Sequence, residues 1–393
     1  MKLFNTLTQS LEDFVPIENT VRLYVCGVTP YDTTHLGHAF TYVTFDNLQR
    51  YLEFLGYGVK YVQNVTDIDD DILRKARELN MRWDELGNRE TERFLNDMDA
   101  LNVRRPAVYA RATEETPMMI QIIEKLIQDD LAYVVDGNVY FSIKQDPDFG
   151  IMAHSVGLNN YQAMLAIAND RGNFPEDKRK RDPLDFVLWQ AKQPGEPSWP
   201  SPWGDGRPGW HIECSSMSMK YLGEQIDIHG GGADLAFPHH TCEIAQSEHY
   251  SGKAPFSRVW MHTGMVYQDG EKMSKSLGNL TLVSNLLKEY SPNTIRIMLA
   301  DHHYRYPWEC FPADLESANH QVQLFEQVKE IVGSQSGEDQ LLRDRFMSAM
   351  NNDLNTPEAL LLLRQASEDA LTNKKVGTGA EILNLVKILG VRL

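Results

Sequence analysis

The chain has 393 residues and a formal net charge of −17, from 38 Lys and Arg against 55 Asp and Glu. This length allows two or three domains with a sizeable core. The negative charge argues against a broadly basic nucleic-acid surface, although it does not exclude a local patch. Four cysteines are too few in so long a chain for a disulfide framework. Because the sequence has neither an apolar signal core nor a membrane-spanning run, we expect a reducing cytoplasm and no membrane partner.

The first predicted elements are a strand, a helix and a second strand within residues 1–78. Residues 22–27 form a short apolar run, and residues 39–55 carry apolar side chains at helical spacing. Residues 57–65 are the second predicted strand. A strand that leads through a tight loop into a helix directs backbone N–H groups and the positive end of the helix dipole at the loop. This arrangement suits a bound phosphate.

A pair of histidines lies in that loop. The block Thr34-His35-Leu36-Gly37-His38 stands at the expected start of the helix. We predict that His35 and His38 stabilise an α-phosphate while it becomes five-coordinate in the transition state. The alternative is that both histidines only make local hydrogen bonds at a helix N-terminus.

The middle of the chain is predicted to be a connective insertion at residues 79–200. It has helical patterns at residues 83–100 and 116–131, a strand-like run at 139–141, and a proline-rich end at 192–203. Residues 1–78 and 201–315 are then the two halves of one catalytic domain, and residues 316–393 are a C-terminal helical domain with three helical stretches. Ligand groups at the ends of parallel strands predict an α/β fold with a doubly wound sheet.

A lysine-serine loop lies between a predicted strand at residues 258–266 and a predicted helix at 283–290. It contains Lys272, Ser274, Lys275 and Ser276. Such a loop can close over the β- and γ-phosphates of ATP, with lysine as a movable charge on the departing pyrophosphate. The alternative is a solvated basic turn. Together with the histidine block, the loop predicts that a carboxylic acid is activated by ATP with Mg²⁺ to form an adenylate.

Four potential metal ligands come from separated segments of the chain: Cys26, Cys214, His239 and Glu243. Two thiolates, an imidazole and a carboxylate are plausible Zn²⁺ ligands, and their dispersal favours an active-site ion over a folding staple. A zinc that accepts an incoming thiol would distinguish cysteine from serine without an editing domain. The alternative is four unrelated residues, and the nearest substitutes as ligands are His240 and Cys242.

These motifs carry a resemblance that covers most of the first 310 residues. Several segments resemble those of the class I cysteinyl-tRNA synthetase group. They are residues 24–32, the His-Leu-Gly-His block, residues 65–70, 206–214, 229–234 and 238–243, and the Lys-Met-Ser-Lys-Ser loop. Within it the chain is more similar to the mycothiol-pathway cysteine ligase, which joins cysteine to the amine of glucosaminyl-inositol. The resemblance implies a class I aminoacyl-tRNA synthetase-like Rossmann domain.

The resemblance also implies roles for individual residues. Cys26, Cys214 and His239 would bind zinc. Glu243 resembles the fourth ligand of the tRNA enzymes, a position where the mycothiol ligases tend to lack a carboxylate, so water is the other candidate ligand. The residues implied at the nucleotide are Thr34, Gly37, Gly230, Gly231, Gly232, Asp234, Ser274 and Ser276. Those implied around the substrate cysteine are Gly27, Thr29, Thr66 and Trp210.

Two acceptors are compatible with these motifs. The region after residue 316 is short and slightly acidic, which favours a small amine acceptor such as an amino sugar. A minimal cysteine–tRNA ligase is the second hypothesis. A non-catalytic protein that binds zinc or nucleotide is the third.

Overall fold

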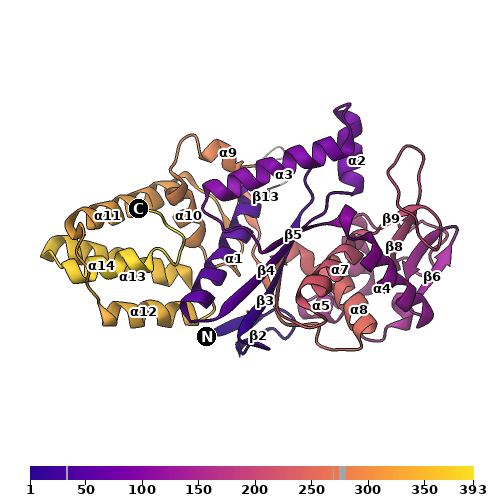
Figure 1. The fold of residues 1–393 in the computed structure, drawn as a ribbon, viewed down its shortest axis with the longest axis horizontal. Coiled ribbons are helices and arrows are strands. Elements are labelled where there is room, and N and C mark those ends of the chain that lie inside the picture. The colour runs from indigo at the N-terminus through magenta and orange to yellow at the C-terminus, as the bar shows by residue number, and fades with distance from the viewer. Residues whose placement is uncertain (32–33, 269, 274–279) are drawn as a thin grey trace.

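A five-stranded parallel sheet forms the centre of the protein, in the strand order β11-β10-β3-β4-β5 (Figure 1). The computed structural model describes residues 1–31, 34–268, 270–273 and 280–393. The chain starts this sheet at β3 and extends it in both directions, which places a crevice at the carboxyl ends of β3 and β10. The predicted doubly wound α/β fold is confirmed. The five strands are β3 (Thr20–Val28), β4 (Gly58–Val65), β5 (Val108–Arg111), β10 (Ile226–Gly232) and β11 (Ser257–Thr263).

Helices cover both faces of the sheet, and β3 shows how the sequence assigns side chains to each face. Leu23 and Val25 enter the apolar core under α1 (Leu36–Phe54), whereas Tyr24 and Cys26 enter the core on the opposite face. This alternation follows from the two-residue period of a strand. The opposite face is covered by α4 (Thr116–Gln128), α7 (Trp210–Leu222) and α8 (Thr241–Ser251). Cys26 therefore points toward α7 and α8.

The start of the insertion differs from the sequence prediction. After α2 (Asp70–Glu78) and α3 (Trp83–Ala100), the chain forms β5, which pairs with β4 at the edge of the central sheet. The chain thus returns to the central sheet at β5, after the residue 79 at which the insertion was predicted to begin. A four-residue edge strand has too few alternating side chains to be recognised in the sequence.

The segment that follows β5 builds a separate antiparallel sheet in the order β6-β7-β8-β9. In Figure 1 this sheet lies at the end of the molecule opposite the C-terminal helices. Its last strand leads into α7, which brings the chain back to the central sheet. The elements are β6 (Ala132–Val135), β7 (Asn138–Phe141), α5 (Ile151–Ser155), α6 (Tyr161–Asp170), β8 (Phe186–Ala191) and β9 (Gly206–Pro208). A small N-terminal hairpin, β1 (Lys2–Asn5) and β2 (Ser10–Asp13), lies beside β11.

The predicted strand at residues 258–266 is two strands in two sheets. β11 ends at Thr263, and β12 (Val266–Gln268) joins β13 (Glu271–Lys272) and β14 (Trp308–Glu309) in the order β13-β12-β14. Gly264 lies between the two strands, and its lack of a side chain lets the backbone of Tyr306 approach, since a Cβ there would lie 2.2 Å from the Tyr306 carbonyl oxygen. The small sheet carries the chain into the lysine-serine loop. The next helix, α9 (Val283–Leu286), is shorter than the predicted 283–290, and α10 (Pro292–Ala300) follows.

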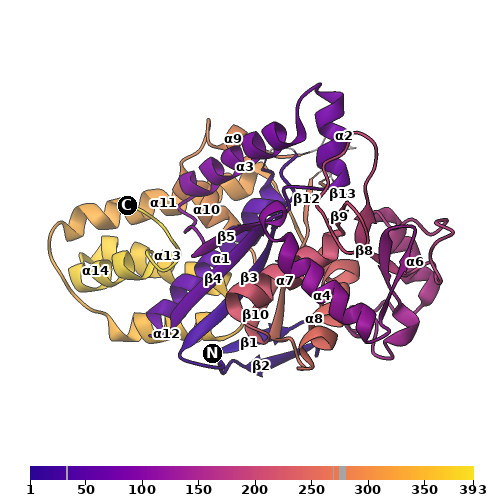
Figure 2. The same cartoon turned by 45° about the vertical axis from the view of Figure 1, so that its right-hand side comes forward.

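The C-terminal region, which is fully described from residue 280 onward, contains four helices where the sequence shows three stretches. It starts at Pro312, slightly before the predicted boundary at 316. These helices share one apolar core with α1, as their position in Figure 2 suggests. They are α11 (Pro312–Val332), α12 (Gln340–Asn351), α13 (Thr356–Asn373) and α14 (Val376–Leu385). Within the described residues, none of the helices has the length and apolar character needed to cross a membrane.

Candidate active site

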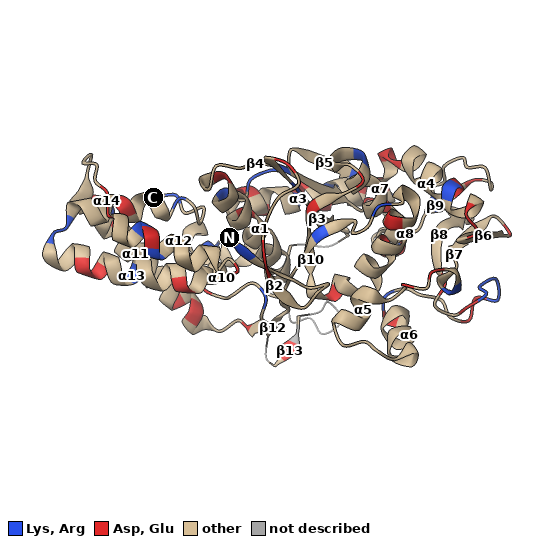
Figure 3. Cartoon of the chain, turned by 90° about the horizontal axis from the view of Figure 1, so that it is seen from below, with Lys and Arg blue, Asp and Glu red and all other residues tan. Residues whose placement is uncertain are grey.

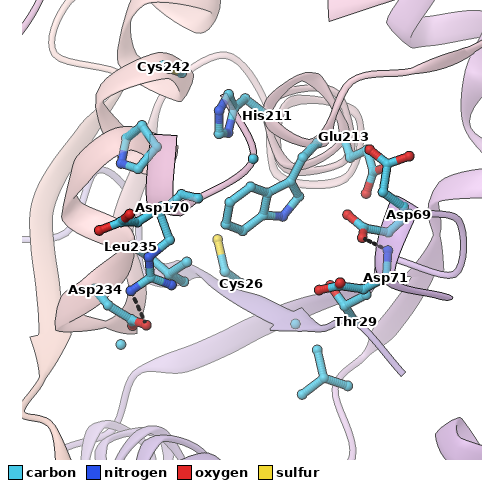
Figure 4. A pocket seen from close by; sticks show the side chains of 18 of the residues that line it. Cys26, Thr29, Asp69, Asp71, Asp170, His211, Glu213, Asp234, Leu235 and Cys242 are labelled. Carbon is cyan, nitrogen blue, oxygen red and sulfur yellow. Dashed lines mark hydrogen bonds and ion pairs between the residues drawn. The ribbon is translucent and has the colours of Figure 1, made fainter. Parts of the chain in front are cut away.

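A cavity of about 1060 Å³ opens where β3, β4 and β10 end. Its wall combines the starts of α1 and α7 with residues of the inserted segment. Figure 4 shows Cys26 and Thr29 between two walls, one with Asp234 and Leu235 and one with Asp69, Asp71 and Glu213. A site of this size at the switch point of a parallel sheet is typical of a nucleotide-binding enzyme.

The four predicted metal ligands meet at the base of this region. One ligand atom each from Cys26, Cys214, His239 and Glu243 lies within 4.8 Å of the other three, and all four residues are buried. The two Sγ atoms are 3.8 Å apart, Cys26 Sγ is 3.5 Å from Glu243 Oε1, and His239 Nε2 is 3.1 Å from the same oxygen. The thiols form no disulfide.

These separations fit a tetrahedral zinc ion. Zinc–ligand bonds of about 2.0–2.3 Å require ligand atoms roughly 3.3–3.8 Å apart. The second carboxylate oxygen of Glu243 is buried without a hydrogen-bond partner among the described residues, which fits a group that serves a cation. The residues present therefore fit zinc.

Burial also sets the protonation of these ligands. It lowers the pKa of the His239 imidazole, so this ring is neutral and able to bind a metal. Burial raises the pKa values of the Cys26 and Cys214 thiols, and a divalent cation would offset that cost for the thiolates. Behind the ligands, His211 Nδ1 lies 2.9 Å from His239 Nδ1 and fixes the ring orientation.

A second group of donors overlaps the first one. Cys26 and Glu243 also lie close to His229 and His240, with 3.5 Å and 3.3 Å between their Nε2 atoms and Cys26 Sγ. His240 is held from its other side by His262, at 2.7 Å. His240 and Cys242 were the two alternative metal ligands considered from the sequence, and His240 belongs to this second donor group. Cys242 lies in neither group and lines the cavity instead.

The histidine block stands at the cavity wall. His35 caps α1 by accepting a hydrogen bond from the His38 N–H at 3.4 Å, and the two rings stack with 3.7 Å between centroids. His35, Gly37 and His38 all line the cavity. A 19-residue helix thus directs its positive end and two imidazoles at the same space. Thr34 is buried and does not contribute to that wall.

The three glycines at the end of β10 have two different roles. Gly232 lines the cavity together with Asp234, which is paired with Arg171 of the inserted segment at 2.9 Å. Gly230 is a packing glycine, because a Cβ there would lie 2.1 Å from Phe45 Cζ of α1. Gly231 similarly faces the side chain of Leu235. Only one of the three glycines therefore borders the space in which a nucleotide would bind.

The residues implied around the substrate cysteine surround the metal ligands. Gly27, Thr29 and Trp210 line the cavity, and the Trp210 ring stacks on His239 with 4.5 Å between centroids. Gly27 has no room for a side chain, since a Cβ would collide with the Asn64 carbonyl oxygen. Thr66 is buried and accepts a hydrogen bond from Asn64 Nδ2 at 3.2 Å.

The lysine-serine loop falls largely outside the described residues. Ser274, Lys275 and Ser276 lie outside the described residues. For Lys272, the structure describes only the backbone, which forms part of β13. Met273, between them, lines the cavity, so this end of the loop is adjacent to the site.

Several cavity residues were not predicted from the sequence. Asp69 and Glu213 form part of one wall, and Arg171 reaches Asp234 from α6's C-terminal end. His211 and His229 complete the surroundings of the metal ligands. Glu213 and His211 lie in the same motif as Trp210 and Cys214, so helical spacing is the signal that points to them.

A doubly wound parallel sheet with an inserted segment and a helical C-terminal region defines the class I aminoacyl-tRNA synthetase architecture. The Mycobacterium tuberculosis methionyl-tRNA synthetase in complex with methionyl-adenylate superimposes with a TM-score of 0.67 at 13% identity, over 94% of this chain and 89% of that chain. An Agrobacterium radiobacter K84 LeuRS superimposes with a TM-score of 0.69 at 12% identity, over 96% of this chain and 84% of that chain. At these identities the likeness concerns the fold.

Residues 13–320 match the family described as the tRNA synthetases class I (C) catalytic domain, and the chain belongs to this family. A cysteine–tRNA ligase of Dehalococcoides mccartyi is 45% identical over 375 residues, which are 94% of this chain and 80% of that protein. The Frankia casuarinae L-cysteine:1D-myo-inositol 2-amino-2-deoxy-alpha-D-glucopyranoside ligase is 45% identical over 362 residues, 92% of this chain and 76% of its own length. The resemblance inferred from the motifs is thereby confirmed.

Proposed function

We propose that this enzyme activates L-cysteine with ATP as cysteinyl-adenylate and transfers the cysteinyl group to the amine of a small amino-sugar acceptor. One observation carries the proposal. A buried donor set of Cys26, Cys214, His239 and Glu243 adjoins the cavity whose wall holds His35 and His38. The thiol end and the carboxyl end of one small amino acid can therefore be held at the same time.

The donor set accounts for the choice of amino acid. When bound there, a zinc ion supplies a Lewis-acid site that prefers a thiolate to a hydroxyl group. Trp210, stacked on His239, lines the cavity beside this donor set and can contact the cysteine side chain. Glu243 and His211 hold the imidazole and thiols in place.

The histidine block accounts for the first reaction step. The cysteine carboxylate attacks the α-phosphate of Mg-ATP, and the phosphate gains negative charge in the transition state. His35 and His38, at the positive end of α1, can donate hydrogen bonds to that charge. Lys272 and Lys275 are proposed to accompany the departing pyrophosphate.

The wall that contains Asp69, Asp71 and Glu213 supports an amine as the acceptor. Asp70 and Asp71 are paired with arginines, whereas Asp69 forms no ion pair among the described residues, so its carboxylate can attract a cationic amine. The 45% identity to the Frankia ligase, whose printed name contains an amino sugar, supports the same acceptor class. Proximity of the amine to the bound adenylate then provides most of the second step's rate.

Transfer to tRNA is the second candidate. Glu243 favours it, because the carboxylate completes a four-residue donor set of the kind that the tRNA enzymes have. The cysteine–tRNA ligases of Dehalococcoides mccartyi and of Methanococcus vannielii, the latter 42% identical over 99% of this chain and 84% of its own length, support it as well.

Isotope exchange between pyrophosphate and ATP tests cysteine activation. The zinc-loaded enzyme should exchange label in the presence of L-cysteine and without RNA. Serine should support exchange at least about 100-fold less well, since its hydroxyl is a poor zinc ligand. Equal exchange with serine, or none with cysteine, would contradict the proposal.

A paired transfer assay then separates the acceptors. The enzyme is given cysteine and ATP with either glucosaminyl-inositol or total tRNA. Formation of the cysteinyl amide with release of AMP supports the amino sugar. Charging of tRNA without amide formation replaces it with the second candidate.

A further inference from the structure

The cavity wall opposite Asp234 is built from carboxyl groups at the junction of β4 and α2 (Figure 4). Asp69, Asp70 and Asp71 are consecutive there, and Glu213 joins them from α7. None of these residues has a role in the activation step described above.

Two of the three aspartates form ion pairs with arginine side chains. Asp70 pairs with Arg207 of β9, and Asp71 pairs with Arg74 of α2. Asp69 forms no ion pair among the described residues. One of its oxygens caps α2 by accepting the Asp71 N–H at 2.8 Å. The other oxygen has no such structural use, and the residue lines the cavity.

Glu213 gives independent evidence that this wall receives a hydrogen-bond donor. Its side chain is 1% exposed, it borders the cavity, and its Oε2 has no hydrogen-bond partner among the described residues. A buried carboxyl oxygen without a donor is costly. A ligand with several N–H groups between Asp69 and Glu213 would supply donors to both.

We propose that Asp69 is the general base of the transfer step, which receives the primary amine of the acceptor and takes a proton from it. The proposal rests on the amine acceptor inferred above. Glu213 lies beside it as a positioning residue for the same amine.

The proposed step balances as follows. The acceptor arrives as an ammonium ion and releases one proton to solvent. Its nitrogen then forms a bond to the carbonyl carbon of cysteinyl-adenylate, and the bond from that carbon to the phosphate oxygen breaks. The electron pair leaves with AMP, and the second proton passes from the nitrogen to the free oxygen of Asp69.

The surroundings of Asp69 suit a base that works near neutral pH. Burial raises the pKa of Asp69 to about 6. The charges of Asp71 and Asp70 also raise this pKa, whereas the hydrogen bond from the Asp71 N–H and the charge of Arg207 lower it. The other ionisable groups on this wall are Asp70, Asp71, Arg74, Arg207, Tyr31 and, from α7, Glu213. Above that pH the carboxylate is free to accept a proton, and below it the transfer step should slow.

Substitution Asp69→Asn in the full-length, zinc-loaded enzyme tests the proposal. The amide oxygen of asparagine can still cap α2, so the fold is retained. With preformed cysteinyl-adenylate and glucosaminyl-inositol, single-turnover transfer should fall about 100-fold, as expected for loss of a general base. Adenylate formation should change less than about threefold. The matched control is Asp129→Asn, an exposed aspartate at the end of α4 that does not line the cavity, which should change neither step by more than about threefold.

Two further measurements distinguish a base from a structural residue. Hydroxylamine is an α-effect nucleophile whose attack on an acyl adenylate depends less on general-base assistance than that of a primary amine, so the variant should still yield cysteine hydroxamate from the adenylate. In wild-type enzyme the transfer rate should rise through about pH 6, and this rise should be absent in the variant.

The outcomes separate this inference from the proposed function. Normal transfer by Asp69→Asn, or an unchanged pH profile, overturns the assignment of Asp69 and leaves the amine acceptor intact. Failure of the wild-type enzyme to form any amide, with tRNA charged instead, overturns both.

Discussion

At the scale of single residues, the thiols of Cys26 and Cys214 lie 3.8 Å apart although they come from β3 and α7. Strand alternation turns Cys26 toward α7, and the position of Cys214 in the first turn and a half of that helix brings it to the same point. Two buried thiols at this distance without a disulfide are a strong sign of a metal.

Substitution Cys214→Ser should remove zinc and cysteine binding together. A serine hydroxyl is a poor zinc ligand, so metal content should fall well below one equivalent. The KM for cysteine in pyrophosphate exchange should rise at least about 100-fold, because the ion and the substrate thiol share one site. Metal analysis and exchange kinetics on the same preparation provide the measurement.

Cys310→Ser is the matched control, since Cys310 is a buried free thiol in the core under the C-terminal helices. It should keep both zinc and cysteine affinity. A Cys214→Ser enzyme that retained full zinc would refute the ligand assignment.

Several residues of the site could be found from the sequence, but some of the residues that surround them could not. His35, Gly37 and His38 could be placed near a helix start because helical periodicity begins at residue 39, three residues after α1 begins at Leu36. Their role at a phosphate stays a prediction. Asp69 and Glu213 could not be found, because they are 144 positions apart and each has an ordinary role in isolation, as a helix cap or a buried helical residue. Their significance comes from facing one cavity, which only the tertiary structure reveals.

At the scale of elements, α3 was predicted with its observed limits, Trp83–Ala100, because eighteen residues carry a clear helical pattern. β5 was missed for the opposite reason, since four residues at a sheet edge leave almost no pattern. The division between β11 and β12 was missed too. The apolar run continues through the break, and only the contact between Gly264 and Tyr306 shows that the chain changes sheets.

Trp308 supports the sheet that leads into the lysine-serine loop. It lies in β14, stacks on His302 with 3.8 Å between ring centroids, and meets Phe40 of α1 edge-on at 5.4 Å. These contacts hold β12 and β14 against the helix that carries the histidine block. Backbone hydrogen bonds from Leu36 to Thr281 and from Val283 to Thr34 join the histidine block to the same part of the chain.

Trp308→Ala should therefore affect both stability and activation. Because the ring is only half-buried, the loss should be about 2 kcal/mol, below the range for a fully buried Trp. Urea unfolding measures this loss, and pyrophosphate exchange should fall severalfold at temperatures where the variant is folded.

Phe311→Ala is the control for that substitution, because the Phe311 side chain is exposed. It should change stability by less than about 0.5 kcal/mol. Equal effects of the two substitutions would show that Trp308 has no special supporting role.

At the scale of the whole molecule, a buried arginine joins the C-terminal region to the catalytic sheet. Arg296 on α10 pairs with Asp46 on α1, and it donates hydrogen bonds to the carbonyl oxygens of Leu101 at 2.8 Å and of Leu389 near the C-terminus. The C-terminal helices are therefore anchored to α1 rather than loosely attached. Figure 3 shows that Lys and Arg are otherwise scattered among Asp and Glu along the molecule.

Arg296→Met should destabilise the protein by about 3 kcal/mol. The substitution leaves the Asp46 charge buried with Arg50 as its remaining partner, and removing one member of a buried pair is expensive. Denaturant unfolding gives the loss directly. Arg345→Met on α12, where the side chain is exposed, should cost less than about 0.5 kcal/mol.

The same pair predicts a pH dependence. Burial alone would raise the pKa of Asp46, but Arg296 and Arg50 outweigh it and hold the pKa below its usual value. A depressed pKa contributes stability above the unfolded-state value of about 4, and this contribution is lost as the pH falls through the folded-state pKa. The difference between wild-type and Arg296→Met protein should therefore shrink in acid. A difference that stayed constant down to pH 2 would contradict the role of the ion pair.

The dispersal of the metal-binding residues along the chain has a consequence for biosynthesis. Cys26 and Glu243 are 217 positions apart, and they meet only after both halves of the central sheet have come together. A nascent polypeptide still on the ribosome before residue 243 lacks the complete donor set. The proposed zinc ion would therefore be bound by all four residues only after residue 243 has been synthesised, and cells starved of zinc should accumulate an inactive apoprotein that regains activity when the metal returns.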